Sequence, residues 1–241
     1  MKKNKSIFIL SFALIFLAVF VWQNNNKLVA VENSFTLTWS SNSSVPLEYE
    51  GLPLPIRGSE IKVFALPTKK LTQDPEKLVY RWVLDGAVMG WANGEGKSSF
   101  VFKSNKWAGD NYEVVSQILD GETVIWRGTV KIRINNPEIL FKSANSDYSV
   151  QEKISSGTNQ TLTVLGIPLF FNTNNQDDLN FKWQIDGYNL TSYDSADLNT
   201  FSLKIPAGKL DQTMIKNLRL TISDKNDDTQ QASSQIILEI K

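Results

Sequence analysis

The sequence predicts an all-β fold in which two tandem antiparallel β-sandwiches follow one N-terminal hydrophobic helix. Three observations support this prediction. A motif around a tryptophan occurs twice, 101 residues apart, and such a fixed period indicates two copies of one structural unit. After residue 34, apolar residues alternate with polar ones at a period of two, which is typical of half-buried strands. An uncharged apolar run lies close to the N-terminus.

Residues 1–22 form the predicted hydrophobic helix. Three lysines among the first five residues precede the run from Ile7 to Trp22, in which Ser11 is the only polar residue. A run of this length lies between the core of a signal peptide and a membrane-spanning helix of about 17–25 residues. The lysines favour a cytoplasmic N-terminus, and Trp22 suits the membrane interface. We therefore expect an uncleaved signal anchor that acts as a transmembrane helix.

Cleavage by signal peptidase is the alternative, and it would release a secreted protein. The peptidase requires small residues at positions −3 and −1. Residues 21–24 offer none, and Ala30 at −1 would place Leu28 at −3. Residues 23–34 contain three consecutive asparagines and are expected to form a polar spacer. In both cases the rest of the chain would lie outside the cytoplasmic membrane.

Residues 35–135 form the first predicted domain and residues 136–241 the second, each of about the usual domain size. The boundary follows an alternating apolar segment, because Asn135, Asn136 and Pro137 favour a turn. At the 101-residue offset, apolar positions of the two halves match as follows: Ile61 with Leu162, Val63 with Val164, Ala65 with Gly166, Phe100 with Phe201, and Phe102 with Leu203.

Aspartate–glycine pairs mark three predicted hairpin turns, at Asp85-Gly86, Asp120-Gly121 and Asp186-Gly187. Both central residues of a type I′ turn have a positive φ, which glycine adopts freely and aspartate tolerates. Strands that recur between such turns, without helical segments between them, indicate antiparallel sandwiches rather than a parallel sheet.

The segments Tyr80–Gly86 and Phe181–Gly187 read aromatic-x-Trp-x-aliphatic-Asp-Gly. This pattern resembles the central tryptophan strand of the immunoglobulin-like and PKD-like repeats of bacterial cell-envelope proteins, and Tyr112–Asp120 is similar to a later strand of these repeats. The resemblance implies core positions for Trp82 and Trp183, and a role in adhesion, spacing or binding at a cell surface. The W-x-F-G-D-G core of many PKD repeats and the two cysteines of antibody-type domains are absent from the sequence.

Composition excludes several classes of function. The chain has no cysteine and no histidine, which removes disulfides, thiolate nucleophiles, the commonest general base and the commonest transition-metal ligand. Its 25 basic and 25 acidic residues balance, with net charges of +3, +1 and −4 for residues 1–34, 35–135 and 136–241. Neither domain has the basic patch that nucleic acid requires. We therefore expect no catalysis, no nucleic-acid binding and no obligatory cofactor.

Tryptophans are concentrated in the first domain. Trp91, Trp107 and Trp126 have no aromatic counterparts in the second domain, and Trp91 and Trp107 stand beside or close to glycines. Exposed aromatic rings on a sandwich suit stacking on sugar rings or contact with a protein partner. These three tryptophans are the candidate binding residues. The alternative is that they fill the core of the first domain or contact the second domain.

A candidate calcium site lies near the C-terminus, where Asp224, Asn226 and Asp228 have the D-x-N-x-D spacing of calcium loops. Calcium takes several oxygen ligands from one tight turn, which this segment could supply. Thr229 and Gln235 stand where such loops carry glycine and glutamate. The alternative is that the segment forms the polar tip of a hairpin between the last two strands.

The predicted function is that of a non-catalytic, single-pass module of the cell envelope. Its extracytoplasmic domains would serve as a scaffold, in adhesion or in protein interaction, for example with a pilus or surface-layer subunit. The expected partners are the membrane, through the N-terminal helix, and an envelope protein or glycan. The alternative is a carbohydrate-binding module that uses the tryptophans of the first domain. An open strand edge at Gln235–Ile240 could pair with a partner strand.

Overall fold

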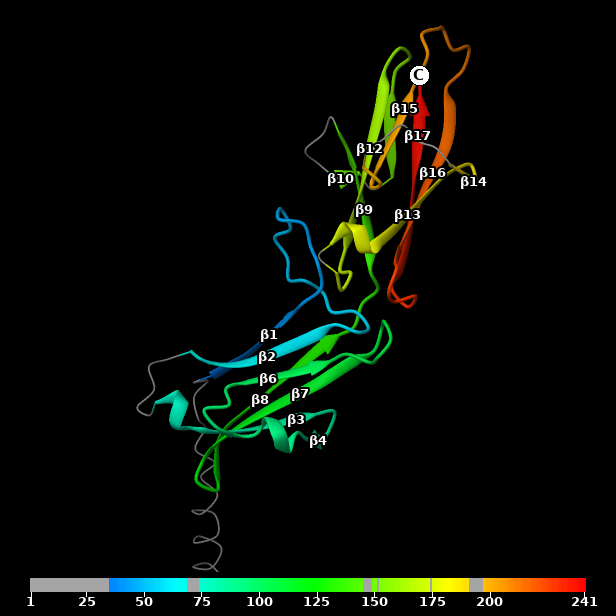
Figure 1. The fold of residues 1–241 in the computed structure, drawn as a ribbon. Coiled ribbons are helices and arrows are strands. Elements are labelled where there is room, and N and C mark those ends of the chain that lie inside the picture. Colours follow the sequence, from blue (N-terminus) through cyan, green and yellow to red (C-terminus); the bar gives the residue numbers. More distant parts are fainter. Residues whose placement is uncertain (1–34, 69–73, 145–148, 151, 174, 191–196) are drawn as a thin grey trace, which may run out of the picture.

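The computed structural model describes residues 35–68, 74–144, 149–150, 152–173, 175–190 and 197–241 (Figure 1). The predicted helix of residues 1–22 and the spacer of residues 23–34 lie outside these ranges. Within them, no helix is long and apolar enough to cross a membrane. The described residues form strands and short 3-10 turns, so the predicted all-β fold is confirmed for this part of the chain.

The first sandwich consists of two antiparallel sheets. One sheet has the strand order β1-β2-β6, and the other has the order β4-β3-β7-β8, with β5 paired to β3. The elements are β1 (Phe35–Ser41), β2 (Glu60–Pro67), η1 (Pro75–Lys77), β3 (Val79–Leu84), β4 (Ala87–Val88), η2 (Gly90–Ala92), β5 (Gly94–Glu95), β6 (Ser99–Lys103), β7 (Asn111–Asp120) and β8 (Thr123–Arg133).

The second sandwich repeats this arrangement. Its sheets have the orders β10-β9-β12-β15 and β11-β17-β16-β13-β14, so that β9, β12, β13, β15, β16 and β17 correspond to β1, β2, β3, β6, β7 and β8. The elements are β9 (Glu138–Ser143), β10 (Ser149–Val150), β11 (Lys153–Ser156), β12 (Thr161–Leu169), η3 (Gln176–Asp178), β13 (Leu179–Ile185), β14 (Tyr188–Asn189), β15 (Thr200–Lys204), β16 (Met214–Asp224) and β17 (Gln231–Ile240).

The repeated tryptophans lie at the centres of the two cores, as predicted. Trp82 is 0% exposed and Trp183 is 1% exposed. Each indole N–H donates to a backbone carbonyl fifteen residues later, at 2.8 Å in the first domain and 3.1 Å in the second. Each ring also packs on a phenylalanine, Phe100 at 5.8 Å and Phe201 at 5.7 Å between centroids. The 101-residue period therefore preserves the polar and the apolar contacts of the tryptophan.

Two of the three predicted turns have the expected conformation. Asp85 and Gly86 have φ values of 48° and 83°, and Asp186 and Gly187 have 49° and 85°, as a type I′ turn requires. The third turn differs by one residue, because Asp120 still pairs with Thr123 and the loop consists of residues 121–122.

The last strand is not the open edge that the sequence suggested. β17 lies between β16 and the short strand β11, and β11 pairs with it in parallel from Lys153 opposite Ile237 to Ser156 opposite Ile240. The prediction of an open edge at Gln235–Ile240 is therefore wrong. An alternating pattern shows which residues face the core, but it does not show which strands are neighbours.

Glu239 joins β17 to β11. Its carboxylate accepts a hydrogen bond from Ser155 Oγ at 2.8 Å and lies 3.0 Å and 3.3 Å from the ammonium groups of Lys241 and Lys153. The hydrogen bond from Ser155, followed by the two lysines, lowers the pKa of Glu239 from 4.5 to about 2. The charged carboxylate is thus favoured in the folded state.

Glu239→Gln is expected to lower the melting temperature of the second domain at pH 7. Because the folded pKa is depressed, the stabilisation is present above about pH 4.5 and disappears as the pH falls towards 2. Thermal unfolding of the wild type and the variant at several pH values measures this difference. A difference that stays constant between pH 7 and pH 2 would contradict the assigned pKa.

Residues 42–59, which connect β1 to β2, form the contact with the second domain, and we refer to them as the interdomain segment. Ser44 exchanges two backbone hydrogen bonds of 2.7 Å with Phe170 and Phe171, just beyond the end of β12. Ser59 Oγ donates to Asn172 Oδ1 at 2.7 Å, and Asn172 Nδ2 donates to the carbonyl of Arg57 at 3.0 Å. The two domains are therefore joined at both ends of this segment.

An apolar cluster of its own lies at this joint, separate from the cores of the two sandwiches. Ile56, Leu169 and Phe170 are buried there, and Tyr49 packs edge-on against Phe170 at 5.7 Å. Phe170 has a φ of 67°, a conformation that bulky residues rarely adopt and that costs energy. The surrounding contacts hold this conformation, which indicates a defined joint rather than a loose linker.

Candidate functional site

The structure separates the three candidate tryptophans. Trp91 lies on η2, is 70% exposed, and has its ring 5.6 Å from that of Phe100. Trp107 lies in the loop between β6 and β7 and is 59% exposed. The guanidinium of Arg57 lies over its ring, 4.0 Å from the ring centroid. The two exposed rings therefore pack on different elements, and no contact between them is found among the described residues.

Trp126 is buried, which corrects its assignment as a surface binding residue. It is 9% exposed, and its ring packs on that of Phe35 at 5.5 Å. Position 126 belongs to the inward-facing series of β8 that includes Ile132 and continues to Ile134, one residue beyond the end of the strand, and both isoleucines are 0% exposed. Alternation counted backwards from Ile134 would have placed Trp126 in the core.

The candidate calcium segment forms the tip of the hairpin between β16 and β17. Asp224 Oδ1 accepts the backbone N–H groups of Asn226 and Asp227 at 2.7 Å and 3.2 Å. The carboxylate of Asp227 accepts hydrogen bonds from Gln230 and Thr229, and these hydrogen bonds lower its pKa. Within the described ranges, no group of three acidic side chains converges to hold a metal. The geometry supports the hairpin alternative, because the carboxylates at 224 and 227 satisfy their own turn.

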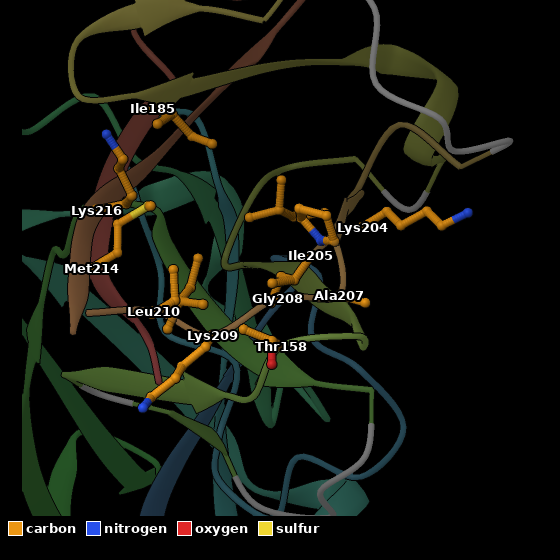
Figure 2. Close-up of a pocket in the computed structure, with 13 residues that line it drawn as sticks. Thr158, Ile185, Lys204, Ile205, Ala207, Gly208, Lys209, Leu210, Met214 and Lys216 are labelled. Atoms are coloured by element: carbon orange, nitrogen blue, oxygen red, sulfur yellow. The ribbon is translucent and has the colours of Figure 1, made fainter. Parts of the chain in front are cut away.

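A cavity of about 290 Å³ opens at one end of the second domain (Figure 2). This end, where the chain finishes, lies away from the first domain (Figure 1). The ends of β13, β15, β16 and β17 surround it, together with the loop from Pro206 to Leu210. Ile185, Leu203 and Ile240 give it an apolar floor. Three lysines and no carboxylate belong to the lining: Lys204, Lys209 and Lys216.

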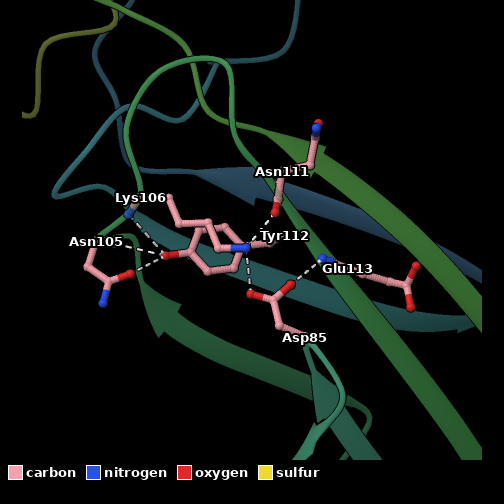
Figure 3. A network of polar contacts seen from close by, with 6 residues as sticks. All are labelled: Asp85, Asn105, Lys106, Asn111, Tyr112 and Glu113. Atoms are coloured by element: carbon pink, nitrogen blue, oxygen red, sulfur yellow. Dashed lines mark hydrogen bonds and ion pairs between the residues drawn. The ribbon is translucent and has the colours of Figure 1, made fainter.

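The corresponding end of the first domain is filled by Tyr112 (Figure 3). Its ring packs on that of Phe102 at 4.9 Å and is 4% exposed. Its hydroxyl donates to Asn105 Oδ1 at 2.7 Å and accepts the backbone N–H of Asn105 at 2.9 Å. A tyrosine near the start of this strand, bonded back to a residue upstream, is a known device for fixing such corners of immunoglobulin-like domains.

Lys216 occupies the position of Tyr112 in the second domain. Asp85 Oδ1 accepts a hydrogen bond from the N–H of Glu113, and Asp186 Oδ1 accepts one from the N–H of Asn217, both at 2.9 Å. These matching hydrogen bonds make Glu113 on β7 equivalent to Asn217 on β16, and therefore Tyr112 equivalent to Lys216. Lys216 turns outward and binds Asp186 Oδ2 at 2.8 Å, a contact that Lys106 makes with Asp85 at 2.6 Å in the first domain.

The cavity follows from this replacement. Among the residues that the structure describes, no aromatic ring lines this end of the second core, and Leu210 on the loop covers it only in part. Analysis of the sequence alone missed these residues. The signal was present in the repeat, where an offset of 104 residues aligns Tyr112 with Lys216.

Asp186, at this end of the second domain, is engaged in a turn and in an ion pair. The ion pair with Lys216 and the N–H of Asn217 lower the pKa of Asp186, with the backbone hydrogen bond as the largest cause. This carboxylate is exposed and holds a turn, as its counterpart Asp85 does in the first domain. The arrangement suits binding by apolar contact and charge.

No family model and no curated protein matches this sequence. Several solved structures of tandem domains are similar in fold. The fibronectin(III)-like modules of Clostridium thermocellum CbhA share 11% identity and a TM-score of 0.29, over 86% of this chain and 94% of that one. The N-terminal Ig1-2 module of the Drosophila receptor protein tyrosine phosphatase DLAR shares 7% identity and a TM-score of 0.28, over 78% and 93%.

The chicken interferon gamma receptor alpha chain shares 10% identity and a TM-score of 0.29, over 74% of this chain and 90% of that one. These likenesses concern the fold alone. The chain is a tandem of two immunoglobulin-like β-sandwich repeats. This assignment rests on the strand order, the two core tryptophans and the paired type I′ turns.

Proposed function

We propose that this protein is a non-catalytic, membrane-anchored spacer and protein-binding module of the cell envelope. In this proposal the residues before 35 anchor the chain, the first domain stands next to the membrane, and the second domain presents its far end to a partner outside the cell. The observation that carries the proposal is the joint between the domains, which combines hydrogen bonds at both ends of the interdomain segment with a buried apolar cluster.

A joint of this kind suits a spacer because it removes freedom between the domains. Domains connected only by a linker are expected to move relative to each other. Here Asn172 is bonded to two residues of the first domain, Arg57 and Ser59, while Phe170 is buried against Tyr49. A held joint keeps the far end of the second domain at a fixed distance and orientation.

Carbohydrate binding remains the second candidate, with a smaller set of residues. Trp91 and Trp107 keep exposed rings that could stack on sugars. Trp126 no longer belongs to this set. We favour the protein-binding proposal because the described part of the chain offers a defined cavity in the second domain, whereas the two exposed tryptophans do not form one platform.

Distance measurements between spin labels test the spacer proposal. The natural chain has no cysteine, so Thr129→Cys and Ser233→Cys place one label on each domain of the full chain in lipid nanodiscs. Pulsed electron resonance is expected to give one narrow distance distribution. The double variant Phe170→Ala/Asn172→Ala removes the apolar and polar contacts of the joint and is expected to broaden it.

Tyr188→Ala is the matched control, because Tyr188 is 78% exposed on the second domain and takes no part in the joint. It should leave the distribution unchanged. A broad distribution for the unmodified joint would show that the domains move freely, and the spacer proposal would then be wrong.

A further inference from the structure

The cavity at the far end of the second domain indicates what kind of partner the protein binds. This inference rests on the proposed protein-binding function. We propose that it binds an extended acidic segment of a partner protein, which inserts one large apolar side chain and places carboxylates next to Lys204 and Lys209. Shape, charge and the neighbouring strand edge each support this occupant.

The shape argument comes from comparing the two repeats. In the first domain Tyr112 is inserted against Phe102 and closes the end of the core. In the second domain the equivalent Lys216 points to Asp186, and Leu203, the counterpart of Phe102, lines an open cavity instead. A volume of about 290 Å³ lies just below the range for ligand pockets, about 300–1,000 Å³. The cavity therefore suits a single large side chain of the segment, while the rest of the segment stays outside it.

The charge argument is local to the cavity. Residues 136–241 carry a net charge of −4, yet the lining contains three lysines and no acidic residue. Lys216 is paired with Asp186, while Lys204 and Lys209 are exposed, and their side chains extend outward from the cavity in different directions (Figure 2). An apolar floor flanked by two exposed lysines is complementary to an apolar side chain that has carboxylates on both sides.

The strand edge favours a peptide over a fatty acid with the same chemistry. Within the described ranges, β15 is the last strand of its sheet and pairs only with β12. Its last two residues, Leu203 and Lys204, also line the cavity. A peptide that pairs with this edge would direct alternate side chains towards the cavity mouth, with main-chain hydrogen bonds giving affinity and the pocket giving specificity.

Binding of a labelled peptide to the full chain in phosphatidylcholine nanodiscs tests the proposal. The probe is an acetylated, fluorescent peptide with an Asp-Asp-Phe-Asp-Asp core between glycine and serine residues. Its binding is measured by fluorescence anisotropy, with empty nanodiscs as the blank. A peptide with alanine in place of phenylalanine is expected to bind about tenfold more weakly or worse. Lys204→Glu/Lys209→Glu should also weaken binding, by about tenfold.

Two pairs of variants separate the causes. Lys216→Phe fills the cavity as Tyr112 does in the first domain and should abolish binding, whereas Lys216→Gln breaks the same ion pair without filling the space and should retain most of it. Lys182→Glu, at an exposed site of the same domain outside the cavity, controls for charge reversal. A cooperative thermal transition of each variant shows that the domain is folded.

Three results would overturn the proposal. Equal binding of the phenylalanine and alanine peptides would reduce the interaction to surface charge. Undiminished binding to Lys216→Phe would place the peptide elsewhere. Binding of sodium laurate in the absence of peptide binding would assign the cavity to a fatty carboxylate. None of these binding results depends on the spin-label distances. A failure of the spacer proposal, seen as a mobile joint, can therefore be told apart from a failure of the peptide-binding proposal, seen as an unoccupied cavity.

Discussion

Trp183→Ala is expected to lower the free energy of unfolding of the second domain by about 3–5 kcal/mol, the usual range for removing a large aromatic side chain from a core. The indole is 1% exposed and packs on Phe141 and Phe201 at 6.1 Å and 5.7 Å. Its removal leaves a cavity and also leaves the carbonyl of Leu198 without the indole N–H as its donor. A loss of this size is a large fraction of the roughly 5–15 kcal/mol that stabilise a domain.

Calorimetry of the full chain measures this effect, since the two domains can unfold in separate transitions. The transition of the second domain should shift to a much lower temperature or disappear, while that of the first domain persists. Trp91→Ala is the matched control, because its ring is 70% exposed and its loss should change stability by no more than about 0.5 kcal/mol. A loss below about 1 kcal/mol for Trp183→Ala would contradict the central position of this residue.

Gly166→Ala is expected to destabilise the second domain by about 1–3 kcal/mol through overpacking. A Cβ atom at position 166 would overlap the Leu220 side chain and would lie 3.5 Å from the ring of Trp183. Ala65 occupies the equivalent position of the first domain, where it is 1% exposed and fits. The first domain carries the smaller Ser116 at the position of Leu220, since these two residues pair with Trp82 and Trp183 respectively.

The overlap with Leu220 gives this prediction an internal check. In the double variant Gly166→Ala/Leu220→Ala the clash is relieved, so its loss of stability should be smaller than the sum of the two single losses. Ala65→Gly controls for the effect of glycine on strand stability and should cost about 0.5–1 kcal/mol. Denaturant unfolding of the four variants decides the matter, and strict additivity would show that the two side chains do not meet.

The features that the sequence predicted correctly are those that repeat. Trp82 and Trp183 lie in equivalent surroundings because the 101-residue period also repeats their phenylalanine neighbours and their carbonyl acceptors. The type I′ turns at Asp85-Gly86 and Asp186-Gly187 also follow this period, whereas the unrepeated Asp120-Gly121 pair did not form the predicted turn. Both features depend on residues close in sequence or on a period that is visible in it.

The features that were missed depend on contacts between distant segments. The parallel pairing of β11 with β17 and the contact of Ser59 with Asn172 join residues 84 and 113 positions apart, and no local pattern marks them. Trp126 was misplaced because its counterpart in the second domain is not aromatic, which suggested a special surface role. The cavity arises from a difference between the repeats at Lys216, and a search for similarity does not reveal differences.

The position of the interdomain segment within the chain has a mechanical consequence. The second domain is connected to the first by the peptide link after β8 and, separately, by residues between β1 and β2. β8 belongs to one sheet of the first domain, and β1 and β2 belong to the other. A pull on the far end of the second domain would thus be divided between both sheets, whereas a linker alone would load a single strand.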